Sequence, residues 1–185
     1  SRPRSVSRGG ARAAVSTSSR VRQIWQGQPT VDGAGVQLTR VIGQAALRDL
    51  NAAAEYLQQQ PFVDPQRIGA VGFCMGGTFA LMMATHNSTI KASVPFYGKV
   101  PPIETLNYLV CPVLYHYGAK DGWVTRQEVD RLKEGLAKFG KPGEVHIYPE
   151  AGHAFFNDTQ PDAYRAEDAK RAWERTLQFL EKYLR

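Results

Sequence analysis

Three residues of this chain have side chains that together could perform nucleophilic catalysis: Cys74, Asp121 and His153. A cysteine attacks a carbonyl carbon once its thiol has lost a proton, a histidine accepts that proton and returns it to the leaving group, and an aspartate orients the histidine. Taken singly, each has a structural explanation: a buried thiol, a turn aspartate, and a histidine bonded to a backbone carbonyl. Their positions relative to the predicted helices and strands favour the catalytic interpretation.

Cys74 lies at a predicted sharp turn between a strand and a helix. The residues around it read Gly-Phe-Cys-Met-Gly-Gly, with the apolar run Ile68–Phe73 before the cysteine and a helical pattern over Thr78–Thr85 after it. Glycines two positions before and after Cys74 permit a tight backbone turn. The thiol is then expected at a helix N-terminus, which favours thiolate, with the N–H of Met75 as a donor to an oxyanion.

Asp121 and His153 follow two further predicted strands. The apolar run 112–117 precedes Asp121, and the run 145–148 precedes the loop that carries His153. Between these strands, capping-box spacing predicts an amphipathic helix from Thr125 to about Phe139. In an open α/β sheet, ligands bind at the carboxyl ends of the strands. Three chemically matched residues at three successive predicted strand ends therefore indicate one shared site.

In these motifs the chain resembles the dienelactone hydrolase family, the cysteine-using branch of the α/β-hydrolases. The matching segments are residues 72–77, 117–121 and 148–155, and the similarity extends from about Gln44 to the C-terminus. The resemblance implies an α/β-hydrolase-like, mostly parallel sheet with flanking helices. It also implies Cys74 as nucleophile, His153 as base and then acid, and Asp121 as the residue that orients the imidazole. The implied reaction is hydrolysis of an ester or lactone through a cysteine thioester, without a metal or cofactor.

Aromatic residues near the predicted site are candidate walls of a substrate pocket. Trp123, Phe155 and Phe156 lie close to it in sequence, although plain packing is the alternative explanation for each. Family members that hydrolyse dienelactone hold its carboxylate with arginines, whereas here no cation follows His153 until Arg165. A neutral or aromatic ester therefore fits this loop better than an anionic lactone.

The segment before the predicted nucleophile strand is short for this fold. A helix is predicted over residues 44–60, and the preceding residues supply at most one strand, at 35–41. The resemblance therefore predicts missing or reduced N-terminal strands, together with loss of a second oxyanion N–H and of a glutamate near the cysteine. An exposed edge on the nucleophile strand would favour a homodimer or a partner fragment. The alternative function is a catalytically impaired remnant that acts as an interaction or oligomerisation module.

Composition predicts one folded domain, residues 23–185, behind a basic leader. The chain has 185 residues, of which 43% are hydrophobic, enough for a single core. Residues 1–22 are rich in Ser, Arg, Gly and Ala, contain no acidic residue and are expected to be disordered. A transit segment and a nucleic-acid-binding arm are the alternatives. The six arginines of this leader account for the net charge of +6, so the rest is neutral and no nucleic-acid face is predicted.

Membrane and compartment predictions follow from apolar runs and cysteine usage. No apolar run approaches the ~18 residues of a membrane span. Two cysteines, Cys74 and Cys111, do not form a disulfide framework, and a free reactive thiol suits a reducing compartment. A cytoplasmic protein that acts on a small ester or lactone, without a membrane or nucleic-acid partner, is the overall expectation.

Overall fold

A computed structural model describes residues 11–16 and 33–185 of the chain. Predictions that concern residues 1–10 and 17–32 lie outside this part. The elements are β1 (Ala11–Ser16), α1 (Gly33–Gln58), β2 (Val63–Phe73), α2 (Met75–His86), β3 (Ile90–Phe96), the short 3-10 helix η2 (Ile103–Tyr108), β4 (Val113–Gly118), α3 (Arg126–Lys138), β5 (Gly143–Tyr148) and α4 (Ala166–Tyr183).

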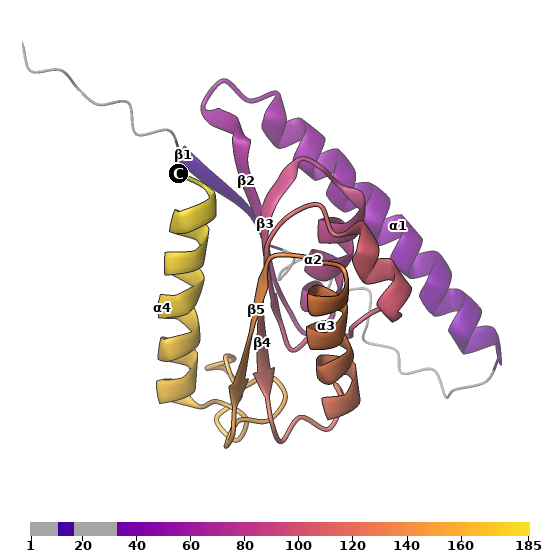
Figure 1. Cartoon of the computed structure of the whole chain (residues 1–185), viewed down its shortest axis with the longest axis vertical. Coiled ribbons are helices and arrows are strands. Elements are labelled where there is room, and N and C mark those ends of the chain that lie inside the picture. The colour runs from indigo at the N-terminus through magenta and orange to yellow at the C-terminus, as the bar shows by residue number, and fades with distance from the viewer. Residues whose placement is uncertain (1–10, 17–32) are drawn as a thin grey trace, which may run out of the picture.

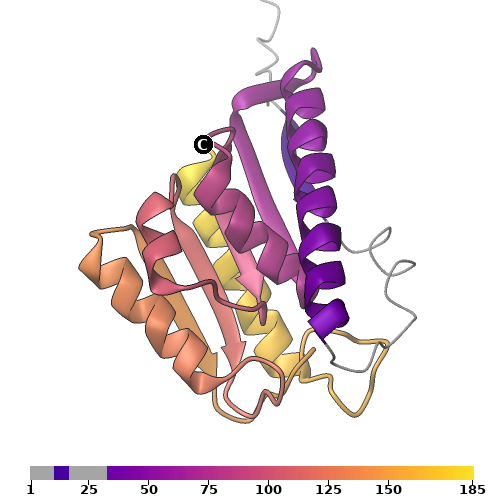
Figure 2. The ribbon, with the colours of Figure 1, turned by 90° about the vertical axis from the view of Figure 1, so that its right-hand side faces the viewer.

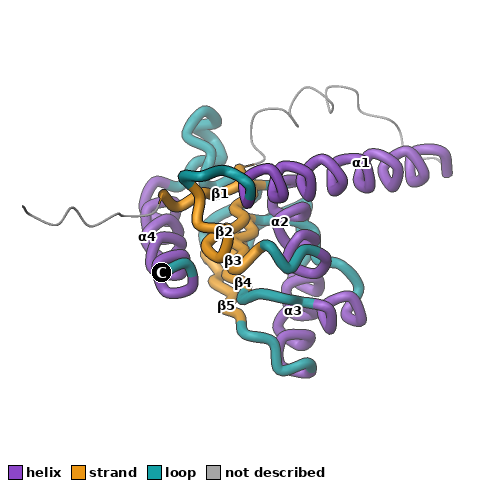
Figure 3. Tube along the Cα trace, turned by 90° about the horizontal axis from the view of Figure 1, so that it is seen from above, coloured by secondary structure: helices purple, strands orange, loops and turns teal. Residues whose placement is uncertain are grey.

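The strands form one parallel sheet in the order β1-β2-β3-β4-β5. Because each crossover moves to the next strand in the same direction and crossovers are right-handed, successive connecting helices fall on one face. Figures 1 and 3 show α1, α2 and α3 on that face and α4 alone on the other. Figure 2 looks onto the face covered by α1, α2 and α3. The mostly parallel sheet with flanking helices that the sequence predicted is confirmed.

Two apolar layers hold the helices to the sheet. Between the sheet and α1–α3 lie residues such as Ile68, Leu81 and Leu132, which are fully buried. Between the sheet and α4 lie residues such as Val94 and Phe179. Side chains that point alternately to two covered faces explain why β3 and β4 are almost continuously buried. The central strands are thereby rigid supports for the loops that follow them.

Strand β1 lies inside residues 1–22, where the composition predicted no strand. It pairs in parallel with the nucleophile strand β2, from Ala13 opposite Ile68 to Ser16 opposite Val71. Backbone groups of an edge strand offer hydrogen bonds to any extended segment, whatever its side chains. The expectation that β2 forms an exposed edge is therefore wrong, because β1 and β3 flank it. A homodimer or a partner fragment stays a prediction, and β1 is the outer strand among the described residues.

The predicted strand at residues 35–41 is also wrong, because helix α1 spans Gly33–Gln58. The segment continues without a break into the Ala- and Leu-rich run that the sequence assigned to a helix. Extending a formed helix costs far less free energy than nucleating a new element, so the neighbouring run outweighs a local preference for strand. Despite its length, α1 is not apolar enough to cross a bilayer, nor is any other helix within residues 33–185.

Strand β3 and helix α4 were not part of the sequence interpretation. β3 lies between β2 and β4, so the three candidate residues follow strands β2, β4 and β5 and not three successive strands. Helix α4 covers the second face of the sheet after the loop that carries His153. The carboxyl ends of all five strands nevertheless meet at one edge, which is where the candidate site lies.

Candidate active site

Cys74 stands at the turn between β2 and α2 in a backbone conformation that L-residues rarely adopt. Its φ is 56° and its ψ is −121°. Such a conformation costs about 1–3 kcal/mol and persists only where the surroundings fix it. The N–H of Cys74 donates to the carbonyl of Phe96 at the end of β3 (3.0 Å), and helix α2 begins at the next residue. The predicted sharp turn with a thiol at a helix start is confirmed.

Two glycines make room for this turn. A Cβ on Gly72 would lie 1.9 Å from the carbonyl oxygen of Gly76, a contact that no side chain can make. A Cβ on Gly98, in the loop after β3, would lie 2.2 Å from the backbone nitrogen of Thr78. The obstructing atoms are backbone in both cases, so they cannot move aside as a flexible side chain would. Close approach of α2 to β2 and to the β3 loop therefore requires glycine at both positions.

The side chains of Cys74, His153 and Asp121 form one hydrogen-bonded row. His153 Nε2 lies 3.1 Å from Cys74 Sγ, and His153 Nδ1 lies 2.8 Å from Asp121 Oδ2. The carboxylate is 0% exposed, whereas the imidazole is 27% exposed and the thiol is half-buried. The predicted convergence of these three residues is thus present, from the ends of β2, β4 and β5. An open side remains at the cysteine and the imidazole, where a substrate would have to enter.

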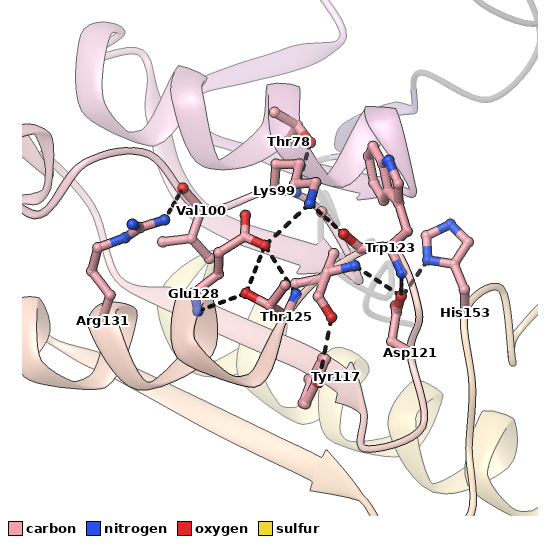
Figure 4. A network of polar contacts seen from close by, with 12 residues as sticks. Thr78, Lys99, Val100, Tyr117, Asp121, Trp123, Thr125, Glu128, Arg131 and His153 are labelled. Carbon is pink, nitrogen blue, oxygen red and sulfur yellow. Dashed lines mark hydrogen bonds and ion pairs between the residues drawn. The ribbon is translucent and has the colours of Figure 1, made fainter. Parts of the chain in front are cut away.

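The second oxygen of the Asp121 carboxylate is held by its own turn. Oδ1 accepts the backbone N–H groups of Trp123 (2.7 Å) and Val124 (2.9 Å), as Figure 4 shows. Thr125 then begins α3 with the predicted capping box, in which Thr125 and Glu128 exchange hydrogen bonds. The two carboxylate oxygens of Asp121 therefore have separate roles. One closes the turn, and the other faces the imidazole.

The surroundings of His153 favour its protonated form. Burial lowers its pKa, but hydrogen bonds to Asp121 and Cys74, together with the charges of these groups, outweigh burial and raise the pKa from 6.5 to about 9. The rings of Trp123 and Tyr97 each stand edge to face against the imidazole, with centroids 5.1 Å away. A protonated ring donates from both nitrogens, which matches an acceptor at each end of the row.

This raised pKa predicts how stability depends on pH. Because the folded pKa of His153 exceeds the unfolded value, its stabilisation is fully present below pH 6.5 and is lost as the pH rises through about 9. We expect parent and His153→Gln to differ in free energy of unfolding by about 3 kcal/mol at most near pH 6, and much less near pH 10. Urea unfolding at both pH values measures this difference. A gap that widens with pH would contradict the assignment.

The other predicted site residues differ in how close to the candidate site the structure places them. Met75 opens α2, so its N–H lacks an intrahelical acceptor and is placed beside the thiol. Trp123 is 40% exposed and contacts His153. Phe156 is half-buried against Phe73 and Phe96. Phe155 is 0% exposed and packs in the core, so its interpretation as a pocket wall is wrong.

Two residues of the site were missed because they belong to the unpredicted end of β3. Tyr97 has a φ of 39°, its ring contacts His153, and its hydroxyl accepts the N–H of Phe156. Burial, with the nearby charge of Cys74, raises the pKa of this phenol. Lys99 reaches across to Trp123 and Glu128. The segment 90–96, in which apolar residues alternate with Lys91 and Ser93, followed by Tyr-Gly, was the signal that could have found this strand end.

The remaining polar groups near the sheet have structural roles. His116 is buried between Tyr148 and Thr176, which bond its two ring nitrogens, as expected for a histidine inside a strand. Among residues 11–16 and 33–185, no three His, Cys, Asp and Glu residues gather closely enough to hold a metal ion. The predicted loss of a second oxyanion N–H and of a glutamate near the cysteine stays a prediction, because residues 17–32 lie outside the described part.

Comparison with known proteins places this arrangement in a family. The dienelactone hydrolase family profile matches residues 26–184. A carboxymethylenebutenolidase of Rhodococcus opacus is 35% identical over 132 residues, which are 65% of this chain and 52% of that protein. A Bradyrhizobium protein named "Probable 2-oxo-3-(5-oxofuran-2-ylidene)propanoate lactonase" is 36% identical over 149 residues, 75% of this chain and 59% of the relative. The chain thus spans about half the length of the curated relatives that it matches.

Solved structures agree with the sequence relatives. A Klebsiella pneumoniae protein assigned to the dienelactone hydrolases superimposes with a TM-score of 0.71 at 32% identity, covering 76% of this chain and 62% of that one. The similarity therefore extends from sequence to fold. The matching profile, the identity to relatives and the shared fold together show that this chain belongs to the dienelactone hydrolase family.

Proposed function

We propose that this protein hydrolyses carboxylic esters or lactones through a thioester on Cys74. The observation that carries the proposal is the hydrogen-bonded row in which one imidazole contacts both Cys74 Sγ (3.1 Å) and the buried Asp121 carboxylate (2.8 Å). A thiol beside an imidazole at a helix N-terminus is set up to lose its proton, since the cation and the helix dipole both stabilise thiolate. Membership of a family of hydrolases supports the same reaction class.

Each step of the reaction uses one of these groups. The Cys74 thiolate attacks the carbonyl carbon, and the resulting oxyanion accepts the N–H of Met75. His153, as imidazolium, gives its Nε2 proton to the departing alkoxide, which leaves an acyl thioester on Cys74. Neutral His153 then takes a proton from water, and the hydroxide attacks the thioester carbonyl carbon. The C–S bond breaks, which releases the carboxylic acid and restores the Cys74 thiolate beside the His153 imidazolium. Asp121 accepts the Nδ1–H throughout and stabilises the imidazolium each time it forms.

The charges around the site favour a neutral ester over an anionic one. Trp123 and Phe156 give its surroundings aromatic surface. Lys99 is the cation that contacts Trp123, but its charge is already paired with Glu128 at 3.1 Å. A substrate carboxylate there would have to compete with Glu128 for the ammonium. We therefore place neutral esters with a flat or aromatic group among the preferred substrates.

Trapping of the acyl intermediate tests the proposal. The protein is mixed with p-nitrophenyl acetate, quenched in acid during turnover and analysed by intact mass and peptide mapping. We expect the release of p-nitrophenolate and a mass increase of one acetyl group, located on the peptide that contains Cys74 and absent from the one that contains Cys111. Failure to acylate Cys74, with the protein folded, would reject the thioester route and favour a non-catalytic interaction module.

A further inference from the structure

Lys99 links the loop after β3 to the loop that carries Asp121. Its backbone N–H donates to the hydroxyl of Thr78 in the first turn of α2 (2.8 Å). Its ammonium donates to the carbonyl of Trp123, forms an ion pair with Glu128 (3.1 Å) and lies 5.2 Å from the centroid of the Trp123 ring. Figure 4 shows this network beside Asp121 and His153. A single residue therefore joins α2, through its backbone, to the Asp121 turn and α3, through its side chain.

Trp123 is the point where this network meets the candidate active site. Its N–H donates to Asp121 Oδ1, its carbonyl accepts from Lys99, and its ring stands against the His153 imidazole. Both peptide groups of Trp123 are thus fixed, one by the carboxylate and the other by the ammonium. If the second bond is removed, the turn retains its bonds to Asp121 but loses its tie to Lys99 and, through Lys99, to Glu128.

Glu128 anchors the other end of the lysine. One carboxylate oxygen, Oε2, accepts from Lys99 (3.1 Å) and from the backbone N–H (2.9 Å) and hydroxyl (3.1 Å) of Thr125. The side chain of Glu128 is only 14% exposed, so this oxygen is well shielded from competing water. The ammonium therefore has a fixed acceptor at α3 from which it reaches Trp123.

We propose that Lys99 is a positioning residue: it fixes the turn 121–124 and the Trp123 ring, and so sets the orientation of His153 towards Cys74. The reaction that it serves is the proposed ester hydrolysis. Lys99 does not need to touch substrate for this role, since two of its three ammonium protons already face the Trp123 carbonyl and Glu128. The competing possibility is direct binding of a substrate carboxylate.

Steady-state kinetics of Lys99→Met separate the two roles. Methionine keeps an unbranched side chain, only one heavy atom shorter, but removes the ammonium. We expect kcat to fall about 10-fold equally for neutral p-nitrophenyl acetate and for anionic mono-p-nitrophenyl succinate, with KM nearly unchanged. A rise in KM for the anionic ester alone would overturn the positioning role. Lys120→Met is the matched control, because Lys120 also pairs with a glutamate, Glu150, but is exposed and does not contact Trp123.

NMR titration of His153 gives a readout that does not depend on turnover. The titratable groups that face its ring are Cys74, Asp121 and Tyr97. Loss of a nearby positive charge alone would raise the pKa of His153, whereas a looser Asp121 would lower it. Positioning predicts that Lys99→Met lowers the pKa by about half a unit, which is about a threefold change in proton affinity. An unchanged or raised pKa would overturn the proposal.

Glu128→Gln provides a second variant if Lys99→Met does not fold. The amide oxygen of glutamine can still accept from Thr125, so the helix cap survives while the ion pair is lost. We expect the same direction of change in kcat and in the His153 pKa, with a smaller amplitude. If the parent protein is inactive on esters but the pKa of His153 still falls in these variants, the proposed function is rejected and the positioning role is retained. No shift in either variant would reject the positioning role itself.

Discussion

Replacing Cys74 with alanine is expected to lower kcat/KM for p-nitrophenyl acetate by at least about 10³-fold. The thiol is the atom to which the acyl group is transferred, and alanine leaves no nucleophile in its place. Binding groups and an oxyanion donor would remain, so a small residual rate above that in buffer is also expected. The measurement is release of p-nitrophenolate by purified parent and variant at equal concentration.

Cys111→Ala is the matched control for this experiment. Cys111 is buried, and burial, only partly offset by the charge of Lys91, raises the pKa of its thiol to about 12. It also precedes β4, at the opposite edge of the sheet from the candidate site. A protonated, inaccessible thiol is a poor nucleophile, so activity should stay within a few-fold of the parent. Equal loss in both cysteine variants would show that the assay detects unfolding and not the loss of a nucleophile.

Local sequence patterns were sufficient to predict that Cys74, Asp121 and His153 lie together. The glycine-flanked cysteine between an apolar run and a helical run specifies a strand, a turn and a helix from neighbouring residues alone. Likewise, the capping box of Thr125 and Glu128 specifies where α3 begins. Because parallel strands present their carboxyl ends at a single edge, placing Cys74, Asp121 and His153 after strands was enough to bring them together.

Those local patterns could not predict pairing between segments that are distant in sequence. β1 consists of short or polar residues with no strand signal of their own, and its hydrogen bonds come from β2, some fifty residues later in the chain. The same limit applies to Lys99, whose position in sequence gives no indication that it contacts Trp123 and Glu128. Contacts of this kind depend on which strands lie side by side, and the sequence interpretation lacked β3.

Neighbouring residues in a loop can also face opposite ways. Phe155 and Phe156 were equivalent as candidate pocket walls, yet the first is in the core and the second is half-buried against Phe73. Ala154, with a φ of 60°, turns the backbone just before them. Outside regular strands, side-chain direction has no fixed period, so composition cannot show which aromatic residue faces the site.

Asp121→Asn is expected to reduce kcat by roughly 10³–10⁴-fold while leaving the fold intact. The amide oxygen of asparagine can still accept hydrogen bonds from the N–H groups of Trp123 and Val124, so the turn is preserved. Its NH2 group then faces His153 Nδ1 and can only donate. The neutral imidazole must place its proton on Nε2, which points at Cys74, and in that tautomer it cannot accept the thiol proton.

Three measurements make this expectation specific. Thermal unfolding should remain cooperative because the turn bonds remain, with a melting temperature lowered by no more than the loss of the charged pair between Asp121 and His153. The rate of Cys74 alkylation by iodoacetamide near pH 7 should fall, because a neutral imidazole no longer stabilises thiolate. Glu150→Gln is the control: Glu150 precedes the His153 loop but is exposed and pairs with Lys120, so activity should stay within a few-fold of the parent. If Asp121→Asn retained activity and Glu150→Gln lost it, Glu150 would be the partner of His153, and the hydrogen bond between Asp121 and His153 would have no catalytic role.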